Sequence, residues 1–243
     1  MKIHGLQKMS LLDYPGHVAC TVFLGGCDFR CPFCHNYELV DGSAEPVMED
    51  VEFFAFLSKR EGILDGVCIT GGEPCLRADL AEFAGRIKEM GFKVKLDTNG
   101  AHPGRVKELI DLGLIDYVAM DIKNSPQKYA ETIGLSSNRP GVIDAGRDNS
   151  VLDFDNIRQT IALLMEDRVD YEFRTTVVEQ YHKKEDFVAI GQLIEGAKKY
   201  FLQQFVARNT VPDCTLEAPN RETIEKYIEV VRRYVPNAEV RGI

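Results

Sequence analysis

The sequence predicts an α/β protein of the barrel type, folded as one domain over residues 1–243. Short runs rich in β-branched residues alternate with stretches that place apolar residues at helical spacing, which is the order of a parallel α/β sheet. A closed barrel needs about eight such repeats in about 250 residues, whereas this pattern repeats only six times. We therefore expect a partial (β/α)6 barrel that is open on one side.

The expected elements follow one another along the whole chain. The strands are expected at Val18–Leu24, Asp65–Thr70, Phe92–Thr98, Ile115–Asp121, Asp170–Val178 and Tyr200–Ala207. The helices are expected at Val51–Arg60, Leu80–Met90, Arg105–Leu112, Ile157–Glu166, Phe187–Lys198 and Ile224–Tyr234. The segment Leu135–Asp153 is rich in Gly, Asp, Asn and Ser and lacks an apolar period, so we expect a surface loop after the fourth strand.

The composition excludes several classes of protein. The chain is 44% hydrophobic and 28% charged, which is ordinary for a globular protein. Its 38 acidic and 29 basic residues give a formal charge of -9, which opposes binding to nucleic acids and to anionic membranes. The sequence has no apolar run of about 18 residues and no apolar export signal at its start. We therefore expect a cytoplasmic protein with no nucleic-acid or membrane partner.

The seven cysteines fall into two groups. An odd number of cysteines in a chain without an export signal indicates reduced thiols rather than a disulfide framework. Four of them show no ligand spacing, and we expect them to be small buried residues: Cys20, Cys68, Cys75 and Cys214. The other three occur within eight residues and need a separate explanation.

Cys27, Cys31 and Cys34 lie in a glycine-led loop, residues 25–36, that directly follows the first expected strand. In α/β barrels, this end of the strands carries the chemistry. Three thiolates on one loop can hold an iron–sulfur cube and leave one iron open to another ligand. The alternative is a zinc site in which His35 supplies the fourth ligand.

Polar motifs follow the next three expected strands. Gly71-Gly72-Glu73-Pro74 ends the second strand, and its glycines allow the backbone to approach a ligand closely. Asp97-Thr98-Asn99-Gly100 ends the third strand, and Asp121-Ile122-Lys123 ends the fourth. Each motif also has a simpler explanation, namely a strand-to-helix turn, an Asn-Gly turn and a solvated lysine. Their shared place at the strand ends favours a common site.

Arg174 interrupts the apolar pattern of the fifth expected strand. An inward-facing arginine needs an anionic partner, and the carboxylate of a bound cofactor would meet this need. The alternative is a pair with an acidic neighbour on the outer face. His182, which follows this strand, is expected to be an exposed loop residue rather than a stacking partner for a base.

The C-x3-C-x2-C motif with Phe33 before its third cysteine resembles the signature of radical S-adenosylmethionine (SAM) enzymes. This resemblance implies a [4Fe-4S] cluster on Cys27, Cys31 and Cys34, whose open iron binds SAM. In that family, one-electron reduction cleaves SAM to give a 5′-deoxyadenosyl radical. No catalytic residue beyond the cluster ligands is implied.

Further motifs extend the resemblance over nearly the whole chain: DYPG, GCDFRCPFCHN, GGEP, LDTNG, MDIK, YEFRTTVV, LQQF and the terminal VRG. Together they resemble the activating proteins of anaerobic ribonucleoside-triphosphate reductase. The implied reaction abstracts a hydrogen atom from the Cα of one glycine in a partner, with flavodoxin or ferredoxin as the electron donor. Many other activators of glycyl radical enzymes carry an inserted ferredoxin-like segment with further clustered cysteines. This chain has no cysteine between Cys34 and Cys68, so the resemblance implies a single cluster.

The same resemblance implies a role for individual residues. Those expected to bind the cofactor are Gly71, Gly72, Glu73, Asp97, Asp121, Lys123 and Arg174. A monovalent cation is a further expectation, at Asp97, Thr98 and Asp121.

Three alternatives remain open. Activators of pyruvate formate-lyase share the CHN sequence after the third cysteine, although their first motif usually reads DGPG instead of the DYPG at residues 13–16. The second alternative is a radical SAM enzyme that acts on a small molecule. The third is a metal-binding module without catalytic activity.

Overall fold

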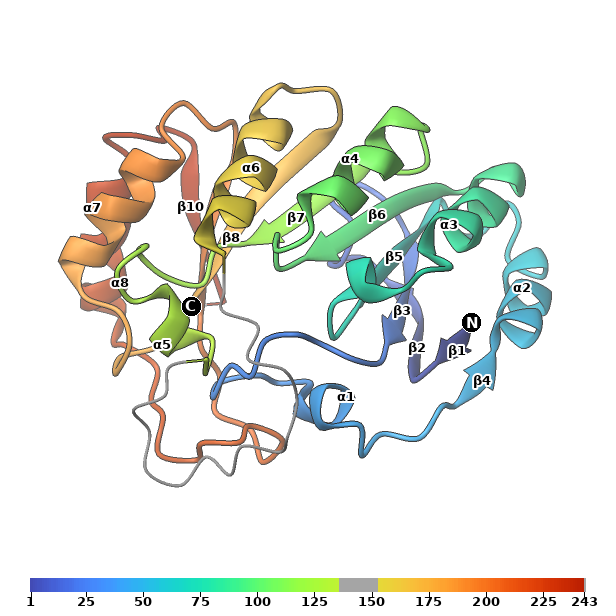
Figure 1. The fold of residues 1–243 in the computed structure, drawn as a ribbon, viewed down its shortest axis with the longest axis horizontal. Helices are drawn as coiled ribbons and strands as arrows, with labels where there is room; N and C mark the ends of the chain where they lie inside the picture. The colour runs from blue at the N-terminus through green and yellow to red at the C-terminus, as the bar shows by residue number, and fades with distance from the viewer. Residues whose placement is uncertain (136–152, 243) are drawn as a thin grey trace.

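The computed structural model describes residues 1–135 and 153–242. Within these ranges, eight strands form one curved sheet in the order β10-β9-β8-β7-β6-β5-β3-β2 (Figure 1). The strands from β3 to β10 in this sheet run parallel, and β2 is antiparallel to β3. Because β2 and β10 lie at opposite ends of this order, the described strands form an open half-barrel, as expected.

The described residues form strands and helices with the following bounds. The strands are β1 (Lys2–Ile3), β2 (Gly5–Ser10), β3 (Ala19–Leu24), β4 (Met48–Glu49), β5 (Gly66–Gly71), β6 (Lys93–Thr98), β7 (Tyr117–Asp121), β8 (Asp170–Val177), β9 (Tyr200–Gln204) and β10 (Ala238–Arg241). The helices are α1 (Tyr37–Asp41), α2 (Asp50–Ser58), the 3-10 helix η1 (Pro74–Leu76), α3 (Leu80–Glu89), α4 (Pro103–Asp111), α5 (Tyr129–Thr132), α6 (Phe154–Met165), α7 (Lys184–Leu193) and α8 (Arg221–Val231).

All six expected strands and all six expected helices are present, with small shifts at their ends. The sequence pattern missed the parallel strand β10, because its four residues are too few to show a period. It missed β2 as well, whose residues do not alternate between buried and exposed, and the two-residue strands β1 and β4. It also missed the short helices α1 and α5. The expected surface loop at Leu135–Asp153 falls mostly on residues 136–152, which lie outside the described residues. None of the described helices is long and apolar enough to cross a membrane.

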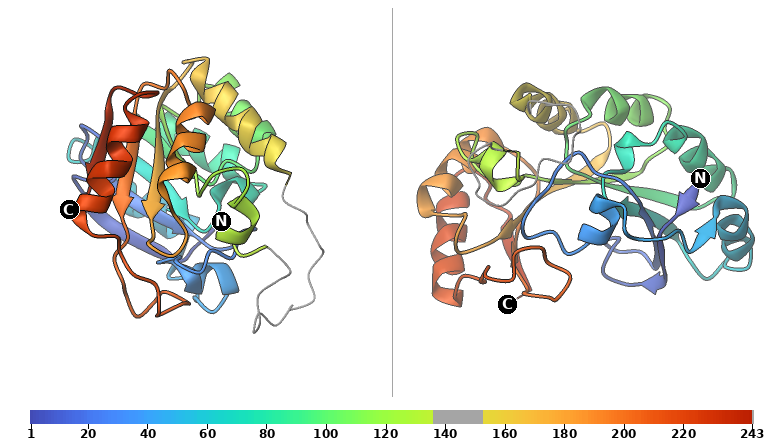
Figure 2. Two further views of the ribbon diagram at one scale, coloured as in Figure 1. Left: turned by 90° about the vertical axis from the view of Figure 1, so that its left-hand side faces the viewer. Right: turned by 60° about the horizontal axis from the view of Figure 1, so that its bottom comes forward.

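Side-chain alternation along the strands separates an apolar layer from a polar one. In β5, Val67 and Ile69 belong to the main hydrophobic core, whereas Cys68 and Thr70 point to the opposite face. The longer helices α2 to α4 and α6 to α8 cover the outside of the sheet, and the loop of residues 25–36 crosses its concave side (Figure 2). The apolar core therefore lies between sheet and helices, and the polar inner face is left for a ligand.

The two ends of the sheet are closed in different ways. At the start of the strands, Tyr14 packs with Tyr117 and Ala19 in a small separate cluster. The DYPG motif to which Tyr14 belongs therefore closes the bottom of the half-barrel. At the edge, Arg241 of β10 makes two hydrogen bonds of 2.9 and 3.0 Å to the buried carboxylate of Glu172, which ties the last strand to β8.

Candidate functional site

The cysteine loop is held in place by backbone hydrogen bonds from three directions. The Gly26 N–H donates to Leu39 O at 2.8 Å, and the Arg30 N–H donates to Ile133 O at 2.8 Å. From the other side, the Asp213 N–H donates to Pro32 O at 3.1 Å. The loop is therefore fixed against segments that are distant in sequence, including α1 and the turn after α5.

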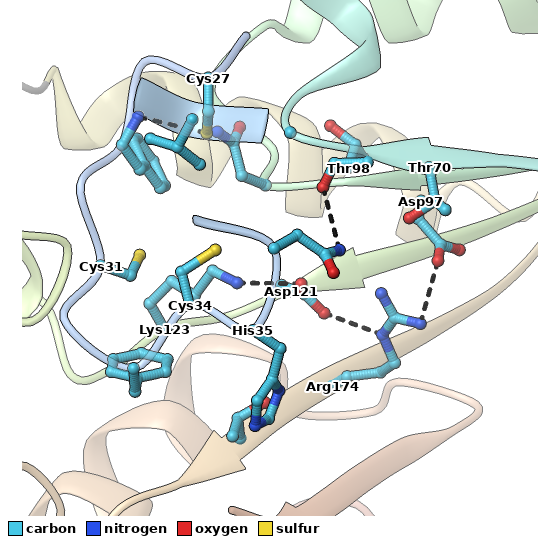
Figure 3. A pocket seen from close by; sticks show the side chains of 18 residues that line it. Cys27, Cys31, Cys34, His35, Thr70, Asp97, Thr98, Asp121, Lys123 and Arg174 are labelled. Carbon is cyan, nitrogen blue, oxygen red and sulfur yellow. Dashed lines mark hydrogen bonds and ion pairs between the residues drawn. The ribbon is translucent and has the colours of Figure 1, made fainter. Parts of the chain in front are cut away.

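The three clustered cysteines line one cavity at the carboxyl ends of the parallel strands, together with polar residues from several strands (Figure 3). All of the cysteines in the chain are free thiols. The remaining lining residues are Phe29, Phe33, His35, Asn36, Val40, Thr70, Gly71, Gly72, Asp97, Thr98, Asn99, Asp121, Lys123, Arg174 and Thr176.

The thiols fit a polynuclear cluster better than a single metal ion. Among the described residues, no three His, Cys, Asp or Glu side chains converge closely enough to hold one ion. An iron–sulfur cube does not require such convergence, because each thiolate binds a different iron. The ring of His35 stacks on Phe205 with an interplanar angle of 12°, and its Nε2 lies 2.6 Å from Val206 O. The geometry thus gives no support to the zinc site with His35.

Burial determines the protonation of these cysteines. It raises the pKa of Cys31 to about 12, although the positive charge of Lys123 opposes the rise. Burial also raises the pKa of Cys27 and of Cys34. All three are therefore neutral thiols at pH 7 in the metal-free protein. Because a metal binds the thiolate, iron binding at this loop must release protons.

Below the thiols, five charged side chains form one connected network. Asp121 accepts a hydrogen bond of 2.9 Å from Lys123 Nζ and one of 2.8 Å from Arg174 Nε. Arg174 Nη1 also lies 3.4 Å from Asp97 Oδ2, and the other oxygen of Asp97 pairs with Lys95. Burial alone would raise the pKa of each carboxyl group, but the neighbouring cations lower the pKa of both Asp97 and Asp121.

The GGEP turn packs directly against the cysteine loop. The Gly72 N–H donates to Leu24 O at 2.8 Å, and the Glu73 N–H donates to Gly26 O at 2.7 Å. A Cβ atom on Gly72 would lie 2.0 Å from Gly26 O, so only glycine fits there. Gly71 has a φ of 126°, a conformation that L side chains rarely adopt.

Glu73 differs from the other predicted cofactor ligands, because its carboxylate does not line the cavity. It is buried and accepts hydrogen bonds from the Cys75 N–H at 2.9 Å, the Thr98 hydroxyl at 2.9 Å and the Asn99 N–H at 2.6 Å. The carboxylate thereby joins the turn after β5 to the end of β6. In this structure Glu73 shapes the wall of the cavity, and the other predicted cofactor residues lie on its surface.

Arg174 faces the cavity as expected, and the outer-face alternative is wrong, because its partners are the inner carboxylates of Asp97 and Asp121. Two expectations for single residues are wrong. His182 is fully buried, and its Nε2 lies 2.9 Å from Lys123 O, because its ring satisfies backbone groups of the turn. Cys214 is exposed, because it lies in the loop between β9 and α8.

Sequence reasoning also missed several residues that build the site. Asp28 accepts hydrogen bonds from Asn99 Nδ2 at 2.8 Å and pairs with His102 Nε2 at 3.0 Å. These contacts join the cysteine loop to the segment after β6, and no spacing rule could have revealed them. The position of Lys95, in contrast, could have been predicted from the sequence. It lies two residues before Asp97, so both side chains are on the same face of the strand.

Comparison with known proteins agrees with this geometry. The family model described as Radical SAM superfamily matches residues 21–177, which cover the cysteine loop and the strand ends from β3 to β8. The chain therefore belongs to the radical SAM superfamily, whose members use a [4Fe-4S] cluster and SAM.

Curated relatives narrow the class. The chain is 30% identical over 249 residues to MJ1227 of Methanocaldococcus jannaschii, whose name assigns it provisionally to the glycyl-radical enzyme activating enzymes; the match covers 99% of this chain and 96% of that protein. It is 31% identical over 157 residues to a pyruvate formate-lyase-activating enzyme of Listeria monocytogenes, covering 59% of this chain and 61% of that enzyme. Within the superfamily, the chain is a member of the glycyl-radical enzyme activating enzymes.

Solved structures share the fold at low sequence identity. Streptococcus suis SuiB, bound to its precursor peptide SuiA, superposes with a TM-score of 0.67 at 13% identity over 91% of this chain and 48% of SuiB. A structure of TYW1 superposes with a TM-score of 0.57 at 17% identity over 89% of this chain and 74% of TYW1. At these identities the likeness concerns the fold alone.

Proposed function

We propose that this protein generates a glycyl radical in a partner enzyme and that the partner is an anaerobic ribonucleoside-triphosphate reductase. The observation that carries the proposal is one cavity lined by three free thiols on one side and by a charged network on the other. When bound, the cluster and SAM would supply an electron and an organic radical that removes a hydrogen atom from a glycine Cα.

The chain's own residues would hold and orient these groups. Cys27, Cys31 and Cys34 would ligate three irons of the cluster. Asp97 and Lys123 lie at the ends of neighbouring strands and would fix the charged groups of SAM. Such fixed geometry favours reaction, because the reacting atoms no longer have to find one another. No proton acceptor is required for hydrogen-atom transfer.

The choice of ribonucleoside-triphosphate reductase as the target rests on motifs along the whole chain that resemble those of its activating proteins. The DYPG motif is one point in which the chain departs from pyruvate formate-lyase activators, and Tyr14 of that motif packs against Tyr117 at the bottom of the half-barrel. The second candidate target is a pyruvate formate-lyase-like enzyme. Partial matches to the activating enzymes of Listeria monocytogenes and Escherichia coli favour this candidate.

The decisive experiment uses the reconstituted protein, a reductant such as flavodoxin, SAM and each of the two candidate partners under anaerobic conditions. We expect a glycyl radical doublet in electron paramagnetic resonance with the ribonucleotide reductase. Replacing the target glycine with alanine should remove the doublet and leave some uncoupled cleavage of SAM. A doublet only with the pyruvate formate-lyase-like partner would refute the ribonucleotide reductase as the target. If no partner gives a doublet but a metabolite is turned over, the proposal that the substrate is a protein would be refuted.

The assignment of the cofactor residues has its own test. Asp97→Ala and Lys123→Ala should retain the cluster, since neither residue binds iron. Each loses a charged hydrogen bond, so SAM affinity should fall roughly ten- to hundredfold. Lys93→Ala is the matched control, because Lys93 lies on the same strand as Asp97 but at its exposed opposite end. Unchanged affinity in both site variants would place the cofactor elsewhere.

A further inference from the structure

The charged network beneath the thiols contains more cations than anions. Its carboxylates are Asp97 and Asp121, and its cations are Lys95, Lys123 and Arg174. Each carboxylate contacts two of the cations, and Arg174 is shared between them. Three positive charges therefore face two negative charges, and neither carboxylate lacks a positive partner.

This balance argues against the monovalent cation expected at Asp97, Thr98 and Asp121. A metal cation near these carboxylates would add a fourth positive charge to an already positive cluster. Thr98 lines the same cavity as Asp97 and Asp121, but its hydroxyl is already engaged elsewhere. Its hydroxyl instead donates to Glu73 Oε1 at 2.9 Å and accepts from the Gly100 N–H at 3.1 Å. The Thr98 hydroxyl is therefore engaged by contacts within the protein.

Lys95 is the member of the network that does not line the cavity, so contact with a bound cofactor cannot account for it. Its side chain is only 2% exposed and lies deeper in the half-barrel than Asp97. Besides Asp97, its Nζ lies 3.7 Å from Cys68 Sγ. Burial lowers the pKa of Lys95, but the Asp97 carboxylate and the Cys68 sulfur together raise this pKa above its ordinary value. A lysine is rarely buried in this way unless it is paired, and the partner of Lys95 is Asp97.

We propose that Lys95 is a built-in monovalent cation, whose ammonium group takes the place beside Asp97 that a metal ion would otherwise fill. Lys95 would act through Asp97 as a positioning residue, because it does not itself line the cavity. In this protein, cofactor binding would then not require Na⁺ or K⁺. The part of the inference that concerns SAM rests on the proposed function, whereas the part that concerns cation binding does not.

The first test measures SAM affinity of the reconstituted protein by equilibrium dialysis at constant ionic strength in potassium, sodium or tetramethylammonium chloride. The wild-type affinity should be the same in all three salts within about twofold. Lys95→Met should bind SAM roughly tenfold more weakly in tetramethylammonium, and K⁺ or Na⁺ should restore affinity by refilling the vacated place. A residue with a merely structural role would not produce this rescue.

Lys93→Met is the matched control. Lys93 lies on the same strand but is exposed, and its Nζ contacts only the ring of His17 among the described residues, at 3.2 Å. Its replacement should leave the SAM affinity independent of the cation. A wild-type protein that loses affinity roughly tenfold in tetramethylammonium would overturn the inference. So would a Lys95→Met variant that binds SAM as tightly as the wild type in that salt.

The second test does not depend on SAM, so it separates this inference from the proposed function. The melting temperature of the wild type should be equal in potassium and in tetramethylammonium, whereas Lys95→Met should melt at a lower temperature in tetramethylammonium and recover in potassium. Equal melting of the variant in both salts would count against a vacated cation site. If Lys95→Met does not fold, Lys95→Gln provides the same comparison, and a potassium-dependent wild type alone would refute the inference.

Discussion

Each end of the half-barrel has a cavity lined by charged residues, but the two cavities differ in how these residues are exposed and connected. At the carboxyl end, Asp97 and Arg174 have side chains only 16% and 14% exposed and are joined in one network. At the opposite end, a second cavity is lined by residues such as Lys93, Asp116 and Lys199. The charges there form separate pairs: Asp116 pairs with Lys88, which lies outside the cavity lining, and their side chains are 32% and 29% exposed.

Both ends of the half-barrel carry charged residues, so charge alone does not distinguish the proposed cofactor cavity from the other one. The cofactor cavity differs because its charged side chains are connected in one network. Water weakens an exposed pair to about 0–1 kcal/mol. Removing one partner of a buried pair lowers the free energy of unfolding strongly, because the other charge stays desolvated. Substitutions at the two ends should therefore have very different effects, and the following predictions measure that difference.

The largest effect should come from the cysteine loop. Anaerobically reconstituted wild type should contain about four irons per chain. Replacing Cys27, Cys31 or Cys34 with alanine should abolish the cluster and its visible absorbance. Cys214→Ala is the control, because this exposed cysteine lies outside the cavity. Iron content that survives in all three loop variants but disappears in the control would reverse the ligand assignment.

An intermediate effect is expected for Arg174, which connects the two inner carboxylates. Arg174→Ala leaves each carboxylate with one lysine, so we expect a loss of about 3 kcal/mol in the free energy of unfolding, at the lower end of the range for a broken buried pair. Chemical denaturation measures this loss. Arg221→Ala removes an exposed pair with Glu225 and should stay within about 0.5 kcal/mol of the wild type. Equal losses in the two variants would show that burial of the network contributes nothing.

The smallest effect should come from the cavity at the start of the strands. Lys199 is exposed, and its Nζ lies 5.5 Å from the centre of the Tyr117 ring. An exposed contact of this kind is worth about 0.5–1 kcal/mol, so Lys199→Met should cost no more than that. Cluster content and SAM affinity should not change. A large loss of SAM affinity in this variant would place the functional site at the wrong end of the half-barrel.

Local sequence was sufficient for most of the fold and for the cysteine loop. Alternation and apolar runs predicted β3 and β5 to β9, most of whose residues are buried, but not the six-residue β2, which is mostly exposed or half-buried. They could not predict β10, whose four residues pair beside Tyr200–Gln203 only after the rest of the sheet has formed. The spacing of Cys27, Cys31 and Cys34 identified the loop because all three cysteines lie within one short segment.

The sequence by itself determined which residues stand at the ends of the strands, since periodicity and turn residues are local properties. Only the tertiary structure decided what those residues contact. It turned Glu73 into the wall of the cavity, buried His182 against the backbone of Lys123, and placed Lys95 and Arg174 on either side of Asp97. These outcomes depend on the register of neighbouring strands and on how deeply each charge is buried. Neither quantity is written in the local sequence, because both arise only when distant segments pack together.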